Sequence, residues 1–177
     1  MGIFAFIKRV LGTGSKDAQS AQRRSKPRLN ARGGMRVLVV DDSSTIVAVL
    51  RRMLQQNGYF ILEAEDAEKG VAIALSERPD LIFLDIVLPG MSGFAALRQL
   101  RRDLATRQIP IIMMSGNEQA TEQFYAQRIG ADDFMKKPFS RAEVFSRIER
   151  LLDDSLLPKR PHVGVTQRAA AASAVAD

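Results

Sequence analysis

The chain has 177 residues, which is long enough for one ordinary domain with tails but too short for two sizeable hydrophobic cores. The 46% of hydrophobic and 26% of charged residues are typical of a globular protein, and no apolar run approaches the ~20 residues that cross a bilayer, which excludes a membrane span. The absence of cysteine excludes disulfides and thiolate metal sites, and we expect a cytoplasmic protein. The net charge of +6 arises in residues 1–34, where eight basic residues accompany one acid, whereas residues 35–152 carry fifteen basic and sixteen acidic residues.

Residues 1–34 are predicted to form a basic, flexible extension outside the folded domain, because they are polar and contain few apolar residues after Leu11. Residues 1–11 are an exception, since their apolar side chains fall on one side of a helical wheel, opposite Lys8 and Arg9. A segment of about eleven residues is too short for a stable isolated helix, so it would fold only on the inner membrane surface or on a partner. A disordered tail, or a true start at Met35, are the alternatives.

From Met35 onward, short apolar runs alternate with helical patterns. The apolar runs predict five strands, at 36–40, 60–64, 81–85, 109–114 and 132–136. Apolar residues at helical spacing fill three of the intervals and the segment after the last strand: Ile46, Val49, Leu50, Met53 and Leu54; Ala67, Val71, Ala74 and Leu75; Phe94, Leu97, Leu100 and Leu104; Val144, Ile148, Leu151 and Leu152. Segment 118–129 has the weakest pattern. These elements predict a doubly wound α/β fold with a five-stranded parallel sheet buried under helices on both faces. We expect residues 153–177 to be a disordered tail.

Polar side chains follow four of the predicted strands at the points where those strands end. Asp41 and Asp42 follow the first strand, Asp85 ends the third, Ser115 follows the fourth and Lys137 follows the fifth. In an open α/β sheet, ligands bind outside the carboxyl ends of the strands, so we expect these side chains to converge on one rim. Any one of these residues alone would more simply cap a helix or lie in a turn, but their coincidence favours a functional site.

Three carboxylates repel one another unless a cation lies among them, and hard oxygen ligands suit Mg²⁺. With its charge screened by Mg²⁺ and Lys137, one carboxylate can attack phosphorus, and Asp85 is the best candidate for that nucleophile. Ser115 and Lys137 would then hold the phosphoryl oxygens, the first through a hydrogen bond and the second as a point charge.

These residues occur in motifs that resemble the receiver domain of response regulators, of the CheY-like kind, across nearly all of residues 35–152. The motifs are VLVVDDS at Asp41 and Asp42, LIFLDIVLPGMSG around Asp85, MMSG at Ser115 and DDFMKKPF at Lys137. Ser92 replaces a frequent Asp of the family and can still cap the following helix. The opening DDSSTI is similar to regulators of chemotaxis-type and twitching-motility pathways.

The resemblance implies a flavodoxin-like sheet of order 2-1-3-4-5 and a two-component signalling function. It implies that Asp42, Asp85 and the Val87 carbonyl hold Mg²⁺, with Asp41 acting through water. It also implies that a histidine kinase or phosphotransfer protein phosphorylates Asp85, that Ser115 then moves toward the phosphoryl group, and that Phe134 turns inward. A downstream protein would bind the face made by the domain's fourth helix, fifth strand and fifth helix. Such a domain catalyses only its own phosphorylation and dephosphorylation.

Two other functions are disfavoured by the sequence. An aspartyl-phosphate hydrolase needs a second acid or base two residues after its nucleophile, whereas Asp85 is followed by Ile86 and Val87. Nucleic-acid binding through the basic residues of 23–32 lacks a recognition motif and interleaved aromatic residues, and a solvated linker explains those residues more simply. Val87 and Asn117 are instead predicted to border the path by which water reaches the phosphoryl group, with neither able to act as a general base.

Overall fold

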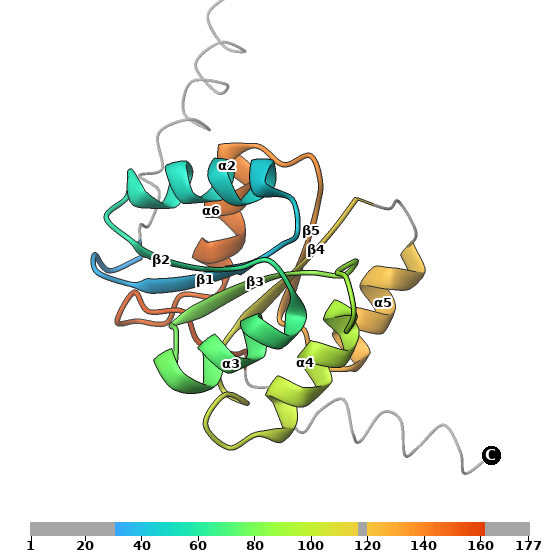
Figure 1. Ribbon diagram of the computed structural model, residues 1–177. Coiled ribbons are helices and arrows are strands. Elements are labelled where there is room, and N and C mark those ends of the chain that lie inside the picture. Colours follow the sequence, from blue (N-terminus) through green and yellow to red (C-terminus); the bar gives the residue numbers. More distant parts are fainter. Residues whose placement is uncertain (1–30, 117–119, 162–177) are drawn as a thin grey trace, which may run out of the picture.

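The computed structural model describes residues 31–116 and 120–161, which contain one parallel sheet with helices on both sides (Figure 1). The strand order is β2-β1-β3-β4-β5, which confirms the expected doubly wound fold. The strands are β1 (Arg36–Val40), β2 (Phe60–Ala64), β3 (Leu81–Asp85), β4 (Ile111–Ser115) and β5 (Asp133–Lys136). The helices are α2 (Ser44–Gln55), α3 (Ala67–Glu77), α4 (Gly93–Arg102), α5 (Ala120–Arg128) and α6 (Arg141–Arg150).

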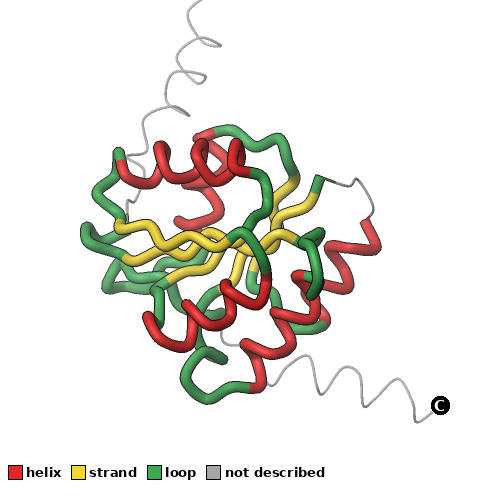
Figure 2. The backbone as a smooth tube through the Cα atoms, viewed as in Figure 1, coloured by secondary structure: helices red, strands yellow, loops and turns green. Residues whose placement is uncertain are grey.

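The helices form two layers, with α2 and α6 on one face of the sheet and α3, α4 and α5 on the other (Figures 1 and 2). Because successive side chains of a strand point to opposite faces, each strand contributes to both layers. In β1, Val37 and Val39 pack in the core under α2 and α6, whereas Leu38 and Val40 pack in the core under α3 and α4. This sandwich covers both faces of the sheet and leaves the ends of the strands accessible.

Most helices begin where a short polar side chain accepts a hydrogen bond from the backbone of the first turn. Ser43, Asp66, Ser92 and Ser140 cap α2, α3, α4 and α6 in this way. Ser92 therefore performs the capping expected of it. These caps fix the residue at which each of these helices begins after the loop that follows a strand.

Three details of the expected helical faces are wrong. In α3, Leu75 is exposed, whereas the other three residues of that expected stripe are buried. In α2, Val47 is buried with Leu50 and Leu54, whereas Val49 is exposed. Around the helix axis, Val49 lies about one hundred degrees or more from the centre of the stripe that the three buried residues form. Leu104 is 76% exposed because α4 ends at Arg102, so residue 104 lies in the following loop and not on the apolar face.

Burial on both faces holds for β1, β3 and β4 but not for β2. Phe60, the first residue of β2, is 66% exposed, and Ile61 and Leu62 are only partly buried. The reason is topological, because β2 is an edge strand that pairs with β1 alone.

The folded unit extends beyond the expected boundaries at 35 and 152. Ala31 is buried in the core under α2 and α6, and the Arg32 amide donates to the Leu156 carbonyl at 2.9 Å. Residues 153–161 also pack on the domain, with a bridge between Leu152 and Pro158. The expectation of a disordered tail from 153 is therefore wrong for residues 153–161, while residues 1–30 and 162–177 lie outside the described residues.

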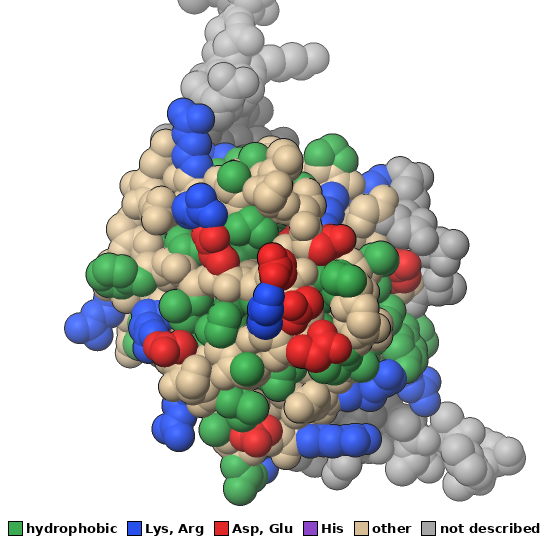
Figure 3. Space-filling view, viewed as in Figure 1, with side chains coloured by type: hydrophobic (Ala, Val, Ile, Leu, Met, Phe, Trp, Pro, Cys, Tyr) green, Lys and Arg blue, Asp and Glu red, His purple; other side chains and the backbone are tan. Residues whose placement is uncertain are grey.

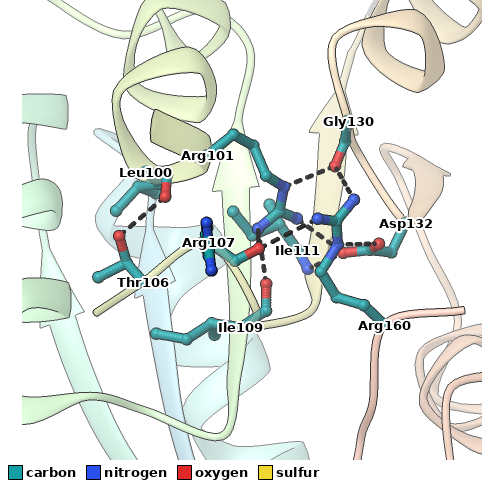
Figure 4. A network of polar contacts seen from close by, with 9 residues as sticks. All are labelled: Leu100, Arg101, Thr106, Arg107, Ile109, Ile111, Gly130, Asp132 and Arg160. Atoms are coloured by element: carbon teal, nitrogen blue, oxygen red, sulfur yellow. Dashed lines mark hydrogen bonds and ion pairs between the residues drawn. The ribbon is translucent and has the colours of Figure 1, made fainter. Parts of the chain in front are cut away.

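A buried ion cluster holds this C-terminal segment (Figure 4). Arg160 Nε donates to Asp132 Oδ1 at 2.8 Å, and Arg101 Nη2 donates to Asp132 Oδ2 at 2.7 Å. The backbone amide of Ile111 also donates to Asp132 Oδ2, at 2.8 Å. The side chain of Asp132 is almost completely buried, so the two arginines offset the cost of placing its charge inside the protein. The cluster lies where β4 and β5 begin, at the end of the sheet opposite to Asp85.

Candidate functional site

The strand register brings the predicted residues to one edge of the sheet. Val40 of β1 pairs with Leu84 of β3, so Asp41 follows β1 at the level of Asp85. Asp85 pairs with Met114, which places Ser115 one residue further along β4. Ser115 in turn pairs with Lys136, so Lys137 follows β5 beside it. Parallel pairing therefore produces the convergence that the sequence predicted.

Three carboxylates form a candidate metal site at this edge. One oxygen from each of Asp41, Asp42 and Asp85 lies within 4.8 Å of the other two. Asp41 and Asp85 are buried, whereas Asp42 is exposed and faces the solvent side of the cluster. Acidic side chains gather near the middle of the face seen in Figure 3, with basic side chains beside them.

The residues present fit a hard divalent cation such as Mg²⁺. Asp41 Oδ1 accepts a hydrogen bond from the Ser43 amide at 3.0 Å, which orients the carboxylate. Asp41 Oδ2 is buried, and the ammonium nitrogen of Lys137 lies 2.6 Å from it. A buried carboxylate oxygen in that position, beside two further carboxylates, can accept a metal ion or a metal-bound water.

Lys137 supplies the positive charge of the site. Its Nζ lies 2.6 Å from Asp41 Oδ2 and 2.9 Å from Asp85 Oδ2. Burial by itself would lower the pKa of Lys137, but hydrogen bonds and charge interactions with the two carboxylates outweigh it and raise that pKa. Lys137 is therefore a fixed cation at neutral pH.

Burial raises the pKa of Asp85, and the Lys137 ammonium opposes that shift while the Asp41 carboxylate adds to it. A carboxylate in this environment has lost much of its hydration and is held close to one ammonium. Such a carboxylate is a better nucleophile than a fully hydrated one, because it needs to shed less water before it reacts.

The backbone at Asp85 is fixed by the start of α4. A Cβ atom built on Gly93 would lie 1.8 Å from the Asp85 carbonyl oxygen, so only glycine permits this approach. The Gly93 amide also donates to the Ile86 carbonyl at 3.0 Å. Gly93 thus lets α4 pack directly against the loop that carries Asp85.

A cavity of about 420 Å³ opens in front of Asp85. It is lined by Asp42, Asp85, Val87, Gly116 and Lys137. Val87 is 67% exposed, so its side chain borders the opening as the sequence predicted. Asn117, the other predicted border, lies outside the described residues. The cavity has room for a phosphoryl group and water.

Ser115 and Phe134 occupy neighbouring strands, but their arrangement differs from the expectation. Ser115 is fully buried, and its hydroxyl donates to Glu122 Oε2 of α5 at 2.5 Å. Phe134 is only 8% exposed and belongs to the core under α4 and α5. Its ring is therefore already inside, so the expected inward turn is not a change open to this arrangement. Sequence reasoning missed Glu122, because nothing in a weak helical pattern indicates which residue of the first turn meets Ser115.

Comparisons with known proteins agree with the fold and with the geometry of this site. The response regulator receiver domain family matches residues 37–149, and the chain belongs to that family. It is a receiver of two-component signalling, as its motifs and its fold indicated.

Curated relatives support the same assignment. Protein PilH of Pseudomonas aeruginosa is 40% identical over 117 residues, which cover 66% of this chain and 97% of PilH. Further curated relatives are transcriptional regulators, and the chain spans about half their length.

Solved structures agree with the fold. The chemotaxis protein CheY4 of Vibrio cholerae has a TM-score of 0.64 at 28% identity, covering 68% of this chain and 100% of CheY4. The receiver domain of the sensor histidine kinase PA1611 from Pseudomonas aeruginosa has a TM-score of 0.61 at 31% identity, covering 67% of this chain and 96% of that domain. That structure holds a magnesium ion in its active-site cleft.

Proposed function

We propose that Asp85 accepts a phosphoryl group from the phosphohistidine of a histidine kinase or phosphotransfer protein. The observation that carries the proposal is the position of Asp85, which is 2.9 Å from Lys137, within a cluster of three carboxylates, and open to a cavity. An Asp85 oxygen would bond to phosphorus while the bond from phosphorus to the donor imidazole breaks, and that electron pair would return to the imidazole nitrogen.

Each remaining residue of the site has a role that its position supports. Asp42 and Asp85 would bind Mg²⁺ together with the Val87 carbonyl, and Asp41 would contact it through water. The ion would neutralise charge on the phosphoryl oxygens. Lys137 would hold one phosphoryl oxygen by its ammonium group, and Ser115 would donate its hydroxyl to another.

The proposed switch connects Ser115 with Phe134 through paired strands. Ser115 lies at the end of β4, and Phe134 pairs with Met113 two residues earlier on the same strand. A change in the hydrogen-bond partner of the Ser115 hydroxyl would then alter the packing between β4, β5 and α5. It would not bury the ring of Phe134, which is already inside the core. Phe134 would transmit this change from inside the core.

The downstream partner would bind the face formed by α5, β5 and α6, which are the fourth helix, fifth strand and fifth helix of the domain. Lys136 of β5 is exposed on this part of the surface, and Phe124 of α5 is exposed as well. These side chains offer a charged and an apolar contact next to the switch.

Residues 1–11 are proposed as a second contact, to the inner membrane surface or a partner. They lie outside the described residues, and within the described ones no helix is long and apolar enough to span a membrane. Deleting residues 1–30 should leave phosphorylation intact and shift the protein from the membrane fraction to the soluble fraction. An unchanged distribution would count against this contact.

The central test is phosphorylation of the full chain by acetyl phosphate with Mg²⁺, measured by intact-protein mass spectrometry. The wild type should gain one phosphoryl group, and Asp85→Asn should gain none. Asp42→Asn should also lose the label, because it removes a proposed metal ligand. Asp80→Asn, which changes an aspartate at the opposite end of β3, is the control and should be labelled like the wild type. Label that persists in Asp85→Asn would overturn the assignment.

A further inference from the structure

The hydroxyl of Ser115 is engaged by a group outside the phosphoacceptor site. It donates to Glu122 Oε2 at 2.5 Å, and Glu122 lies in the first turn of α5. This distance falls in the range of charge-assisted O–H···O⁻ bonds, which are roughly twice as strong as neutral ones. The bond joins the end of β4 directly to α5.

A serine hydroxyl has a single hydrogen to donate. In the proposed function, that hydrogen must go to a phosphoryl oxygen on Asp85. In the structure it goes to the Glu122 carboxylate. Both acceptors are anionic, so they compete for the same donor, and Ser115 cannot serve both at once.

We infer that Glu122 is a positioning residue that retains the Ser115 hydroxyl and so opposes its donation to the phosphoryl group. This inference rests on the proposed function of Asp85. Glu122 stabilises the unphosphorylated arrangement, because the Ser115–Glu122 bond exists only there. Phosphorylation breaks that bond and releases the first turn of α5 from the end of β4.

The competition has a measurable consequence for affinity. If the Ser115–Glu122 bond must break before Ser115 binds a phosphoryl oxygen, removing the acceptor removes that cost. A hydrogen bond to a charged group is strong enough to change an equilibrium constant by about tenfold. The effect should disappear when Ser115 has no hydroxyl to contribute.

The experiment titrates the full chain, saturated with Mg²⁺, with beryllium fluoride as a phosphoryl mimic and measures affinity by calorimetry. Glu122→Ala should bind the mimic about tenfold more tightly than the wild type. Glu122→Gln should show a smaller gain, because a neutral amide oxygen is a weaker acceptor that still keeps Ser115 satisfied. Gln123→Ala, an exposed neighbour on α5, is the control and should bind like the wild type.

A double-mutant cycle separates the hydrogen bond from the charge of Glu122. In a Ser115→Ala background, adding Glu122→Ala should change the affinity by less than about twofold. An unchanged affinity in both Glu122 variants, or the same gain with and without the Ser115 hydroxyl, would overturn the inference while leaving the proposed function intact. Failure of the wild type itself to bind the mimic would overturn the proposed function, and the inference with it.

Discussion

The ammonium group of Lys137 lies 2.9 Å from Asp85 Oδ2, so the residue after β5 contacts the last residue of β3 across the end of β4. The same ammonium reaches Asp41 at 2.6 Å. Lys137 therefore connects the proposed phosphoacceptor to β5, the strand that carries Phe134.

Replacing Lys137 should separate phosphorylation from its structural response. Lys137→Ala keeps the three carboxylates, so acetyl phosphate with Mg²⁺ should still label it. Because the contact with β5 is lost, amide shifts at Phe134 on addition of beryllium fluoride should be smaller than in the wild type. Lys136→Ala, one residue earlier, should retain the full response at Phe134. Loss of labelling in Lys137→Ala would show that the lysine is needed for the chemistry itself.

Asp85→Asn should stabilise the protein in the absence of Mg²⁺. Burial raises the pKa of Asp85, and a carboxyl whose pKa is raised by folding costs stability at pH values above that pKa. An uncharged amide avoids this cost, so the free energy of unfolding at neutral pH should rise by on the order of 1 kcal/mol. With Mg²⁺ the difference should shrink, because the wild type gains stability by binding the ion. Urea unfolding with and without Mg²⁺ measures both effects, and a less stable Asp85→Asn in both conditions would contradict the prediction.

Gly93→Ala should unfold the site or the whole domain. The added Cβ would lie 1.8 Å from the Asp85 carbonyl oxygen, a backbone atom that cannot rotate away. We expect a loss of about 3 kcal/mol or more in the free energy of unfolding, together with loss of labelling. Gly33→Ala is the matched control, because its Cβ would meet no atom within 4 Å, and its effect should stay within about 0.5 kcal/mol.

Arg160→Ala should lower the free energy of unfolding by about 1–3 kcal/mol, because the side chain of Asp132 is buried and would keep, among the described residues, only Arg101 as its cationic partner. Lys159→Ala, an exposed neighbour in the same segment, should have an effect within about 0.5 kcal/mol. Chemical unfolding of the three proteins gives the comparison. Equal stabilities for Arg160→Ala and the wild type would mean that the ion pair between Arg160 and Asp132 adds nothing to the stability of the fold.

Val87→Asn should shorten the lifetime of the phosphoryl group. Val87 borders the cavity in front of Asp85 and is largely exposed, so the change should not disturb folding. Valine can only exclude water there, whereas an amide can orient a water molecule for attack on phosphorus. The rate of label loss after removal of acetyl phosphate measures the lifetime, with Val87→Leu as the apolar control. Equal rates for Val87→Asn and the wild type would reject this gatekeeping role.

The sequence by itself determined the element order and the rim of the site. Apolar runs such as residues 81–84 are continuous because both faces of the strand are buried, and that pattern is local. Once the strands are parallel, the residues after them share an edge, so Asp41, Asp85 and Lys137 could be placed together before any contact was known.

Only the tertiary structure decided which side chains meet within that edge and where the domain ends. The partner of Ser115 is Glu122, in a helix whose own pattern is weak, and the partner of Arg160 is Asp132 at the far end of the sheet. The exposure of Phe60 likewise follows from the edge position of β2. These contacts depend on how strands and helices pack against one another in space, and a local pattern of apolar and polar residues does not encode that packing.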